Sequence, residues 1–187
     1  DVLDPKEDFN VVRFQQMAKD AAREIWAKGR IPLVVGGTGF YIQALLYDID
    51  FTENDGDIVY RQELEKIARE KGGEYLHTLL EAVDPQASTT IHPNNIKRMI
   101  RALEFHRQTG GKISEHNEKE RAKESPYNYA YFVLTDERGR LYERIDKRVD
   151  LMLGEGLEDE VRFLREQGVK RGATAMQGLG YKETYAY

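Results

Sequence analysis

The chain has 187 residues, 40% of them hydrophobic and 33% charged, with 28 lysines and arginines against 33 aspartates and glutamates. This composition excludes a disordered tail, a collagen and a low-complexity linker, and the length suits one domain with a small insertion. A net charge of −5 argues against general binding to nucleic acid. The apolar runs are far shorter than the roughly 20 residues that span a bilayer, and cysteine is absent, so we expect a cytoplasmic protein with no membrane segment.

Charge is unevenly spread along the sequence. Residues 92–123 carry eight basic and four acidic side chains, whereas residues 53–91 carry four basic and nine acidic ones. A local basic surface can bind phosphates even when the whole chain is acidic. The chain also opens on Asp1 rather than methionine, and we therefore expect it to be part of a longer protein.

The N-terminal elements follow the order helix, strand, glycine turn, helix. Apolar residues recur at helical spacing over 11–28, and the continuous apolar run 31–35 has the composition of a strand buried on both faces. Glycines at 36, 37 and 39 break this strand before a short helix over 41–47. The order predicts a doubly wound α/β fold with a parallel sheet.

Helical periods replace the strand signals beyond residue 51. The predicted domains are therefore an α/β core made of residues 1–50 and 127–187, and a helical insertion over 51–126. We expect the polar run 116–126 to be a mobile link back to the core. A returning strand is predicted at 129–135, followed by one long helix over 137–167.

The glycine turn after the first predicted strand is a candidate anion site. Free backbone N–H groups and the positive end of a helix dipole would lie beside the hydroxyl of Thr38. A tight turn in which Thr38 merely caps the helix explains the same residues equally well. The turn has no lysine and is not a phosphate loop of the GxxxxGK[ST] type.

Two helices present arginines in patterns that suit phosphate binding. In the helix predicted to begin after Asn95 and end at Gly110, the cations Lys97, Arg98 and Arg101 share one face, opposite the apolar side chains. An ordinary exposed basic face is the alternative. In the helix 137–167, Arg144 borders the apolar stripe and needs either a carboxylate or a phosphate as its partner.

Taken in order, the blocks IPLVVGGTGFYIQALLYD, IHPNNIKRMIRALE, LYERIDKRVDLMLGEGLEDEV and AMQGLGYKE resemble the bacterial tRNA dimethylallyltransferases. The resemblance covers essentially the whole chain. It implies a P-loop-like parallel sheet core and a helical insertion that grips the tRNA anticodon stem-loop. It also implies transfer of a dimethylallyl group from dimethylallyl pyrophosphate to N6 of the adenosine 3′-adjacent to the anticodon, with Mg²⁺, and we expect a monomer.

The resemblance assigns roles to individual positions. It implies that Thr38 lies beside the transferred group and the target amine, and that Arg144 binds the donor pyrophosphate. The positions implied to contact tRNA or the pyrophosphate are Arg61, Lys97, Arg98, Arg101, Met176, Gln177, Gly178, Leu179, Gly180 and Tyr181. The family's phosphate loop and its proton-accepting aspartate would lie upstream of this chain, and we expect the chain alone to be inactive. No residue here is predicted to bind a metal.

Two other functions fit the same sequence. A small-molecule kinase of the P-loop type would share the α/β core, but its lid rarely needs an insertion of some seventy residues with a one-sided basic helix. A non-catalytic RNA-binding module would use the basic helix without any transfer chemistry. Phosphate transfer to small acceptors would identify the first, and RNA binding without turnover would identify the second.

Overall fold

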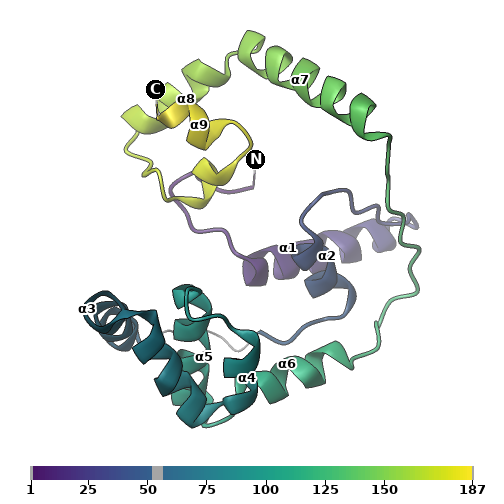
Figure 1. Cartoon of the computed structure of the whole chain (residues 1–187). Coiled ribbons are helices and arrows are strands. Elements are labelled where there is room, and N and C mark those ends of the chain that lie inside the picture. Colours follow the sequence, from purple (N-terminus) through teal and green to yellow (C-terminus); the bar gives the residue numbers. More distant parts are fainter. Residues whose placement is uncertain (1, 52–56, 187) are drawn as a thin grey trace. The chain divides into compact units, whose positions relative to one another are not determined.

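The structure is a computed structural model that describes residues 2–51 and 57–186 (Figure 1). Within these ranges every regular element is a helix, and no residue lies in a β-strand. The predicted α/β fold with a parallel sheet core is therefore wrong for the described chain. Contacts divide the residues into two compact units, one made of Asp1–Ile42 and Asn128–Tyr187 and the other of Gln43–Tyr127.

The two predicted strands are irregular, exposed segments. Residues 31–35 and 129–135 carry large apolar side chains, among them Leu33, Val35, Phe132 and Leu134, that are between 81% and 94% exposed. A strand needs a neighbour to pair its backbone N–H and C=O groups, and its apolar faces need layers to cover them. In the described part of the chain neither segment belongs to a β-sheet. Their composition therefore predicts a sheet that is not formed here.

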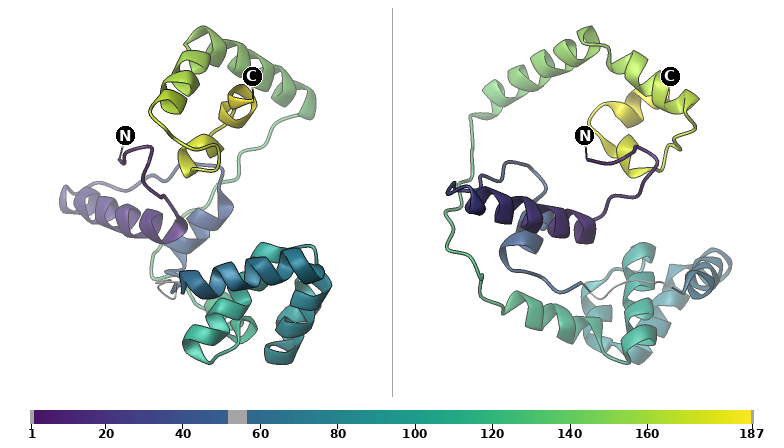
Figure 2. Two further views of the ribbon diagram at one scale, coloured as in Figure 1. Left: turned by 90° about the vertical axis from the view of Figure 1, so that its left-hand side faces the viewer. Right: turned by 180° about the vertical axis from the view of Figure 1, so that it is seen from behind.

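The unit Gln43–Tyr127 is a cluster of helices. It contains α3 (Ile58–Val83), α4 (Pro85–Thr90), α5 (Ile96–Thr109) and α6 (Ile113–Arg121), which gather together in every view (Figures 1 and 2). Helix α5 packs mainly on α3. The core consists of Leu64, Leu76, Leu80, Ala87, Met99, Ile100, Ala102 and Leu103. Residues 52–56 of the predicted insertion lie outside the described ranges.

The boundaries of α5 confirm the predicted basic helix. The helix ends where Gly110 adopts a φ of +68° and donates its N–H to the carbonyl of His106, a conformation that favours glycine. The predicted mobile link is wrong over 116–121, because these residues lie in helix α6 (Ile113–Arg121), whereas residues 122–126 form no regular element. The first turn of α6 is held by Ser114, whose N–H and hydroxyl donate to the two carboxylate oxygens of Asp84 at 2.9 and 2.6 Å.

Asp84 joins α4 and α6 through a buried carboxylate. It also accepts a hydrogen bond from the N–H of Ala87 at 3.0 Å, which caps α4. Burial by itself raises the pKa of this carboxyl, but the hydrogen bonds from Ser114 and Ala87 and the charge of Lys112 outweigh it and lower the pKa.

A folded-state pKa below the unfolded one makes stability depend on pH. The stabilisation by Asp84 is expected to be complete above the unfolded value of about 3.9 and to be lost as the pH falls through the lower folded value. Urea unfolding between pH 7 and pH 2 would measure this loss. In Asp84→Asn the acid-dependent part should shrink, and a variant whose stability falls with acid in parallel with the parent would contradict the assignment.

The other unit begins with α1 (Val11–Ala27), as predicted from its apolar spacing. The ring of Phe14 stacks on Tyr41, with centroids 4.9 Å apart. Tyr41 lies in α2 (Gly39–Leu46), which confirms the short helix expected after the glycine turn. No helix in the described residues is both long enough and apolar enough to cross a membrane.

The predicted long helix over 137–167 is two helices. Helix α7 (Arg138–Gly154) and helix α8 (Leu157–Glu166) are separated at Gly156, whose φ of +99° cannot continue a right-handed helix. Beyond α8 come a 3₁₀ turn, η1 (Thr174–Gln177), and α9 (Tyr181–Tyr185). They close a small second core that contains Leu164, Val169 and Met176.

Candidate functional site

Helix α5 presents the predicted basic face at its N-terminal half. Its apolar side chains, Met99, Ile100 and Leu103, enter the core against α3, and this fixes which face of the helix is turned outward. Lys97 and Arg98 are exposed, and Arg101 is half-buried. The first turn contains no acidic residue. The cations therefore form a positive surface that suits a polyanion.

Arg61 of α3 reaches α5 through a two-point ion pair with Glu104. The Nε and Nη2 groups of Arg61 each donate to one carboxylate oxygen of Glu104, both at 2.7 Å. The Glu104 side chain is 2% exposed, whereas that of Arg61 is 48% exposed. The hydrogen bond to Glu104 raises the pKa of Arg61. A buried carboxylate needs such a partner, because desolvating its charge alone is costly.

Further contacts between α3 and α5 surround this ion pair. The guanidinium of Arg107 lies over the ring of Tyr60, 4.6 Å from its centroid, and its Nε is 3.7 Å from a carboxylate oxygen of Asp57. Burial lowers the pKa of Arg101, although the charge of Glu104 acts in the opposite direction. We call Asp57, Tyr60, Arg61, Arg101, Glu104 and Arg107 the α3–α5 cluster.

The glycine turn at 36–39 forms the start of α2. The carbonyl of Thr38 accepts the N–H groups of Tyr41 and Ile42 at 3.0 and 3.3 Å. Thr38 and the turn are exposed. The backbone of Thr38 thus begins α2, which agrees with the interpretation of the turn as a helix start, and the residue itself is exposed.

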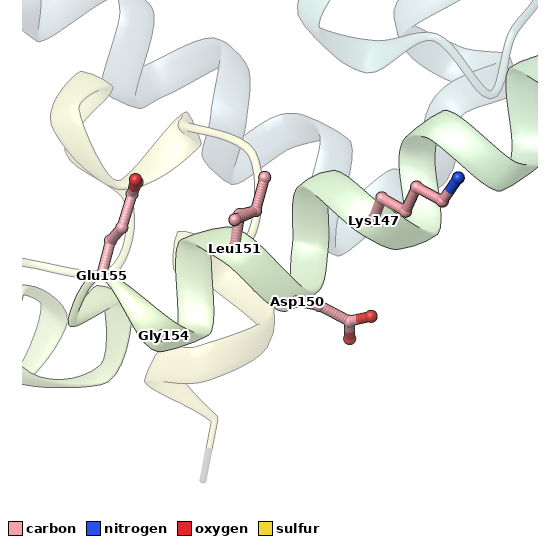
Figure 3. Close-up of a pocket in the computed structure, with 5 residues that line it drawn as sticks. All are labelled: Lys147, Asp150, Leu151, Gly154 and Glu155. Atoms are coloured by element: carbon pink, nitrogen blue, oxygen red, sulfur yellow. The ribbon is translucent and has the colours of Figure 1, made fainter.

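Arg144 lies on α7 with its side chain 73% exposed, 3.3 Å from a carboxylate oxygen of Asp136. Farther along α7 an open hollow of about 600 Å³ is lined by Lys147, Asp150, Leu151, Gly154 and Glu155 (Figure 3). All five residues come from α7 and its C-cap. The hollow contains none of the predicted site residues and is a surface feature of one helix.

The predicted loop 176–181 contains both core and surface residues. Met176 is fully buried in the second core, whereas Gln177, Gly178 and Leu179 are exposed. Gly180 has a φ of +86°, and a Cβ there would lie 2.9 Å from Leu157 Cδ2. Burial raises the pKa of Tyr181, which is half-buried. In this conformation the accessible part of the loop is 177–179.

The predicted residues divide between the two units. Lys97, Arg98, Arg101 and Arg61 belong to Gln43–Tyr127, where Arg61 pairs with Glu104 and the charge of Glu104 also acts on Arg101. Thr38, Arg144 and the loop 176–181 belong to the other unit. In the described ranges no three His, Asp or Glu side chains gather as a metal site would require.

Sequence reasoning missed Glu104. Its signal is its place on α5, where it is the one acidic residue and lies beside the apolar stripe rather than opposite it. A carboxylate at the border of the apolar stripe is buried when the helix packs, and its buried charge then requires a cation as partner. The sequence does not indicate which cation, because Arg61 lies 43 residues away.

The sequence matches the family described as IPP transferase over residues 1–187. It is 59% identical to the tRNA dimethylallyltransferase of Lachnoclostridium phytofermentans, over 100% of this chain and 60% of that protein. It is 47% identical to the tRNA dimethylallyltransferase of Bacillus cytotoxicus, over 100% of this chain and 58% of that protein. The chain thus spans less than two thirds of the length of these relatives.

Solved structures show the same likeness. The full-length tRNA isopentenylpyrophosphate transferase from Bacillus halodurans aligns with a TM-score of 0.60 and 42% identity, over 100% of this chain and 57% of that one. A eukaryotic dimethylallyltransferase acting on tRNA aligns with a TM-score of 0.78 and 28% identity, over 97% of this chain and 46% of that one.

Proposed function

We propose, because this chain belongs to the IPP transferase family, that the whole protein transfers a dimethylallyl group from dimethylallyl pyrophosphate to tRNA. The acceptor would be N6 of the adenosine 3′-adjacent to the anticodon. The observation that carries the proposal is the family match along residues 1–187, joined to a basic face on α5 that suits an RNA backbone. The relatives' names support the tRNA substrate.

The reaction forms a bond between N6 and the allylic carbon and breaks the bond between that carbon and the pyrophosphate oxygen. N6 also loses a proton, which would pass to the proton-accepting aspartate that the family resemblance places upstream of this chain. Pyrophosphate leaves readily once its charge is neutralised. Arg144 would bind it through a fork of N–H donors. The hydroxyl of Thr38, an exposed residue, would position the amine or a phosphate oxygen.

Mg²⁺ would neutralise further charge on the pyrophosphate when bound. The described residues contain no cluster of carboxylates fitted to hold it, and no step of the reaction is assigned to it.

The acceptor base must leave its stack before its amine can reach the allylic carbon, which requires a few kcal/mol. Phosphate contacts from Lys97, Arg98 and Arg101 would offset that requirement.

Arg98→Ala tests the RNA-binding part of the proposal. It is expected to weaken binding of an anticodon stem-loop RNA and to lower the salt slope, log K against log salt concentration, by about 0.7 to 0.9, the value of one phosphate contact. Fluorescence anisotropy over a salt series would measure both.

Lys66→Ala is the matched control for that experiment. Lys66 is an exposed cation on α3 that pairs with Glu70 at 3.9 Å. Its removal lowers the net charge equally, and the slope should stay near that of the parent. An unchanged salt slope in Arg98→Ala would contradict RNA binding by this residue and would favour the alternative, an ordinary exposed basic face.

A further inference from the structure

The guanidinium of Arg61 is fixed on one side and open on the other. Its Nε and Nη2 groups donate to the buried carboxylate of Glu104, yet the side chain is 48% exposed. An arginine carries five N–H donors in a rigid plane. Two are used by Glu104, so that the second N–H of Nη2 and the neighbouring N–H of Nη1 remain as a fork on the adjacent edge of the plane.

Arg101 belongs to the same electrostatic group. Its charge interacts favourably with Glu104 and unfavourably with Arg61. The charge of Glu65 acts on Arg61 as well. The positive charge that suits a phosphodiester therefore comes from the exposed Lys97 and Arg98 of α5, together with the donor edge of Arg61 that Glu104 leaves unused.

We propose that Glu104 is a positioning residue for RNA binding: its carboxylate holds the guanidinium of Arg61 so that the remaining fork binds a backbone phosphate. A free arginine loses rotamer freedom when it binds a phosphate. Here the orientation is already fixed by folding, so the RNA meets a prepared donor pair. This inference rests on the proposed function, because the phosphate belongs to the tRNA acceptor.

Glu104→Gln separates positioning from simple charge. If only net charge mattered, removal of a carboxylate from a basic surface would tighten RNA binding. Positioning requires the opposite result, and we expect anticodon stem-loop binding to weaken about tenfold, the equivalent of one charged hydrogen bond. Glu81→Gln is the matched control, since Glu81 is an exposed acid near the other end of α3 and its loss makes the same change in charge.

A double-mutant cycle tests whether Glu104 acts through Arg61. In an Arg61→Ala background, Glu104→Gln should no longer weaken binding. Arg61→Lys keeps the charge but not the fork, and we expect a weakening similar to that of Glu104→Gln. Circular dichroism melting of each variant, with binding measured well below its midpoint, keeps a loss of folding apart from a loss of binding. Because Arg61 is half-exposed, the lysine variant provides the test even where Glu104→Gln does not fold.

The outcomes distinguish this inference from the proposed function. Tighter binding by Glu104→Gln, equal to that of Glu81→Gln, would overturn the positioning role while a weakened Arg98→Ala still supports tRNA binding. Parental binding by Arg61→Lys would also overturn it. If the parent chain prefers the stem-loop no more than an unrelated RNA hairpin of equal length, the proposed function fails and the inference fails with it.

Discussion

Substitution of Gly73 by alanine is expected to destabilise the unit Gln43–Tyr127 by about 3 kcal/mol, because the new methyl group has no space. A Cβ at this position would lie 2.3 Å from the carbonyl oxygen of Pro93 and 3.1 Å from Cδ1 of Ile96. The first of these atoms is backbone and cannot rotate away. Relief requires a shift of the segment that leads into α5, and we therefore expect the basic face to move with it.

Urea unfolding gives the free energy, and hydrogen exchange followed by mass spectrometry shows where protection is lost. We expect faster exchange in α3 and α5, at Leu76 and Leu103 among others. Gly139→Ala on α7 is the control, since no atom outside its own helix lies within 4 Å of the added methyl. That variant should be unchanged or more stable by less than the roughly 0.5 to 1 kcal/mol of a mid-helix glycine, because Gly139 lies in the first turn of α7. Equal behaviour of the two variants would contradict the close contact at Pro93.

Helices whose pattern is local could be predicted from the sequence. The apolar spacing of 96–109 and the glycine at 110 determine the start, face and end of α5, and none of these depends on a distant residue. The helix over 11–28 was predicted for the same reason. The prediction of one helix over 137–167 failed at Gly156. The apolar spacing of the sequence continues past this glycine, but its left-handed backbone conformation ends the helix there.

The sheet was predicted wrongly, because strand composition indicates which surroundings a residue suits and not whether those surroundings are present. The run 31–35 is rich in branched apolar residues, which suit a position covered on both faces. Whether such a run forms a strand depends on a partner elsewhere, and the described residues supply none. The polar run 116–126 shows the converse. Its composition predicts a link, yet residues 113–121 are helical, with Ser114 held by the distant Asp84.

The same limit applies to the candidate site. Cations that share one face of a helix can be recognised from their spacing in the sequence, and both Lys97 and Arg98 are exposed in the structure. The carboxylate that organises Arg61 comes from a helix 43 residues farther along the chain, and no local rule links the two. Met176 is similar, since a glycine-rich turn gives no sign that one of its members is fully buried.

Arg144→Ala in the whole protein is expected to lower dimethylallyl transfer by about 100-fold to 1,000-fold, the usual effect of removing one donor that stabilises developing charge. The side chain is 73% exposed and donates a long hydrogen bond of 3.3 Å to Asp136, so its loss should change stability by less than about 0.5 kcal/mol. The contribution of Arg144 to folding is therefore small, and a large loss of transfer would support the proposed contact with the donor pyrophosphate. Arg144→Lys retains the charge without the fork and should fall between the parent and the alanine variant.

Arg140 provides a closely matched control on the same helix. Its side chain is also 73% exposed, and its Nε is 3.6 Å from a carboxylate oxygen of Glu137, much as Arg144 pairs with Asp136. Arg140→Ala thus removes the same charge and a similar ion pair from α7, and transfer should remain within about twofold of the parent if only Arg144 meets the pyrophosphate. Single-turnover transfer of labelled dimethylallyl groups to an anticodon stem-loop would compare them. Equal losses in both alanine variants would mean that the general charge of α7 matters and that Arg144 has no specific contact with the donor.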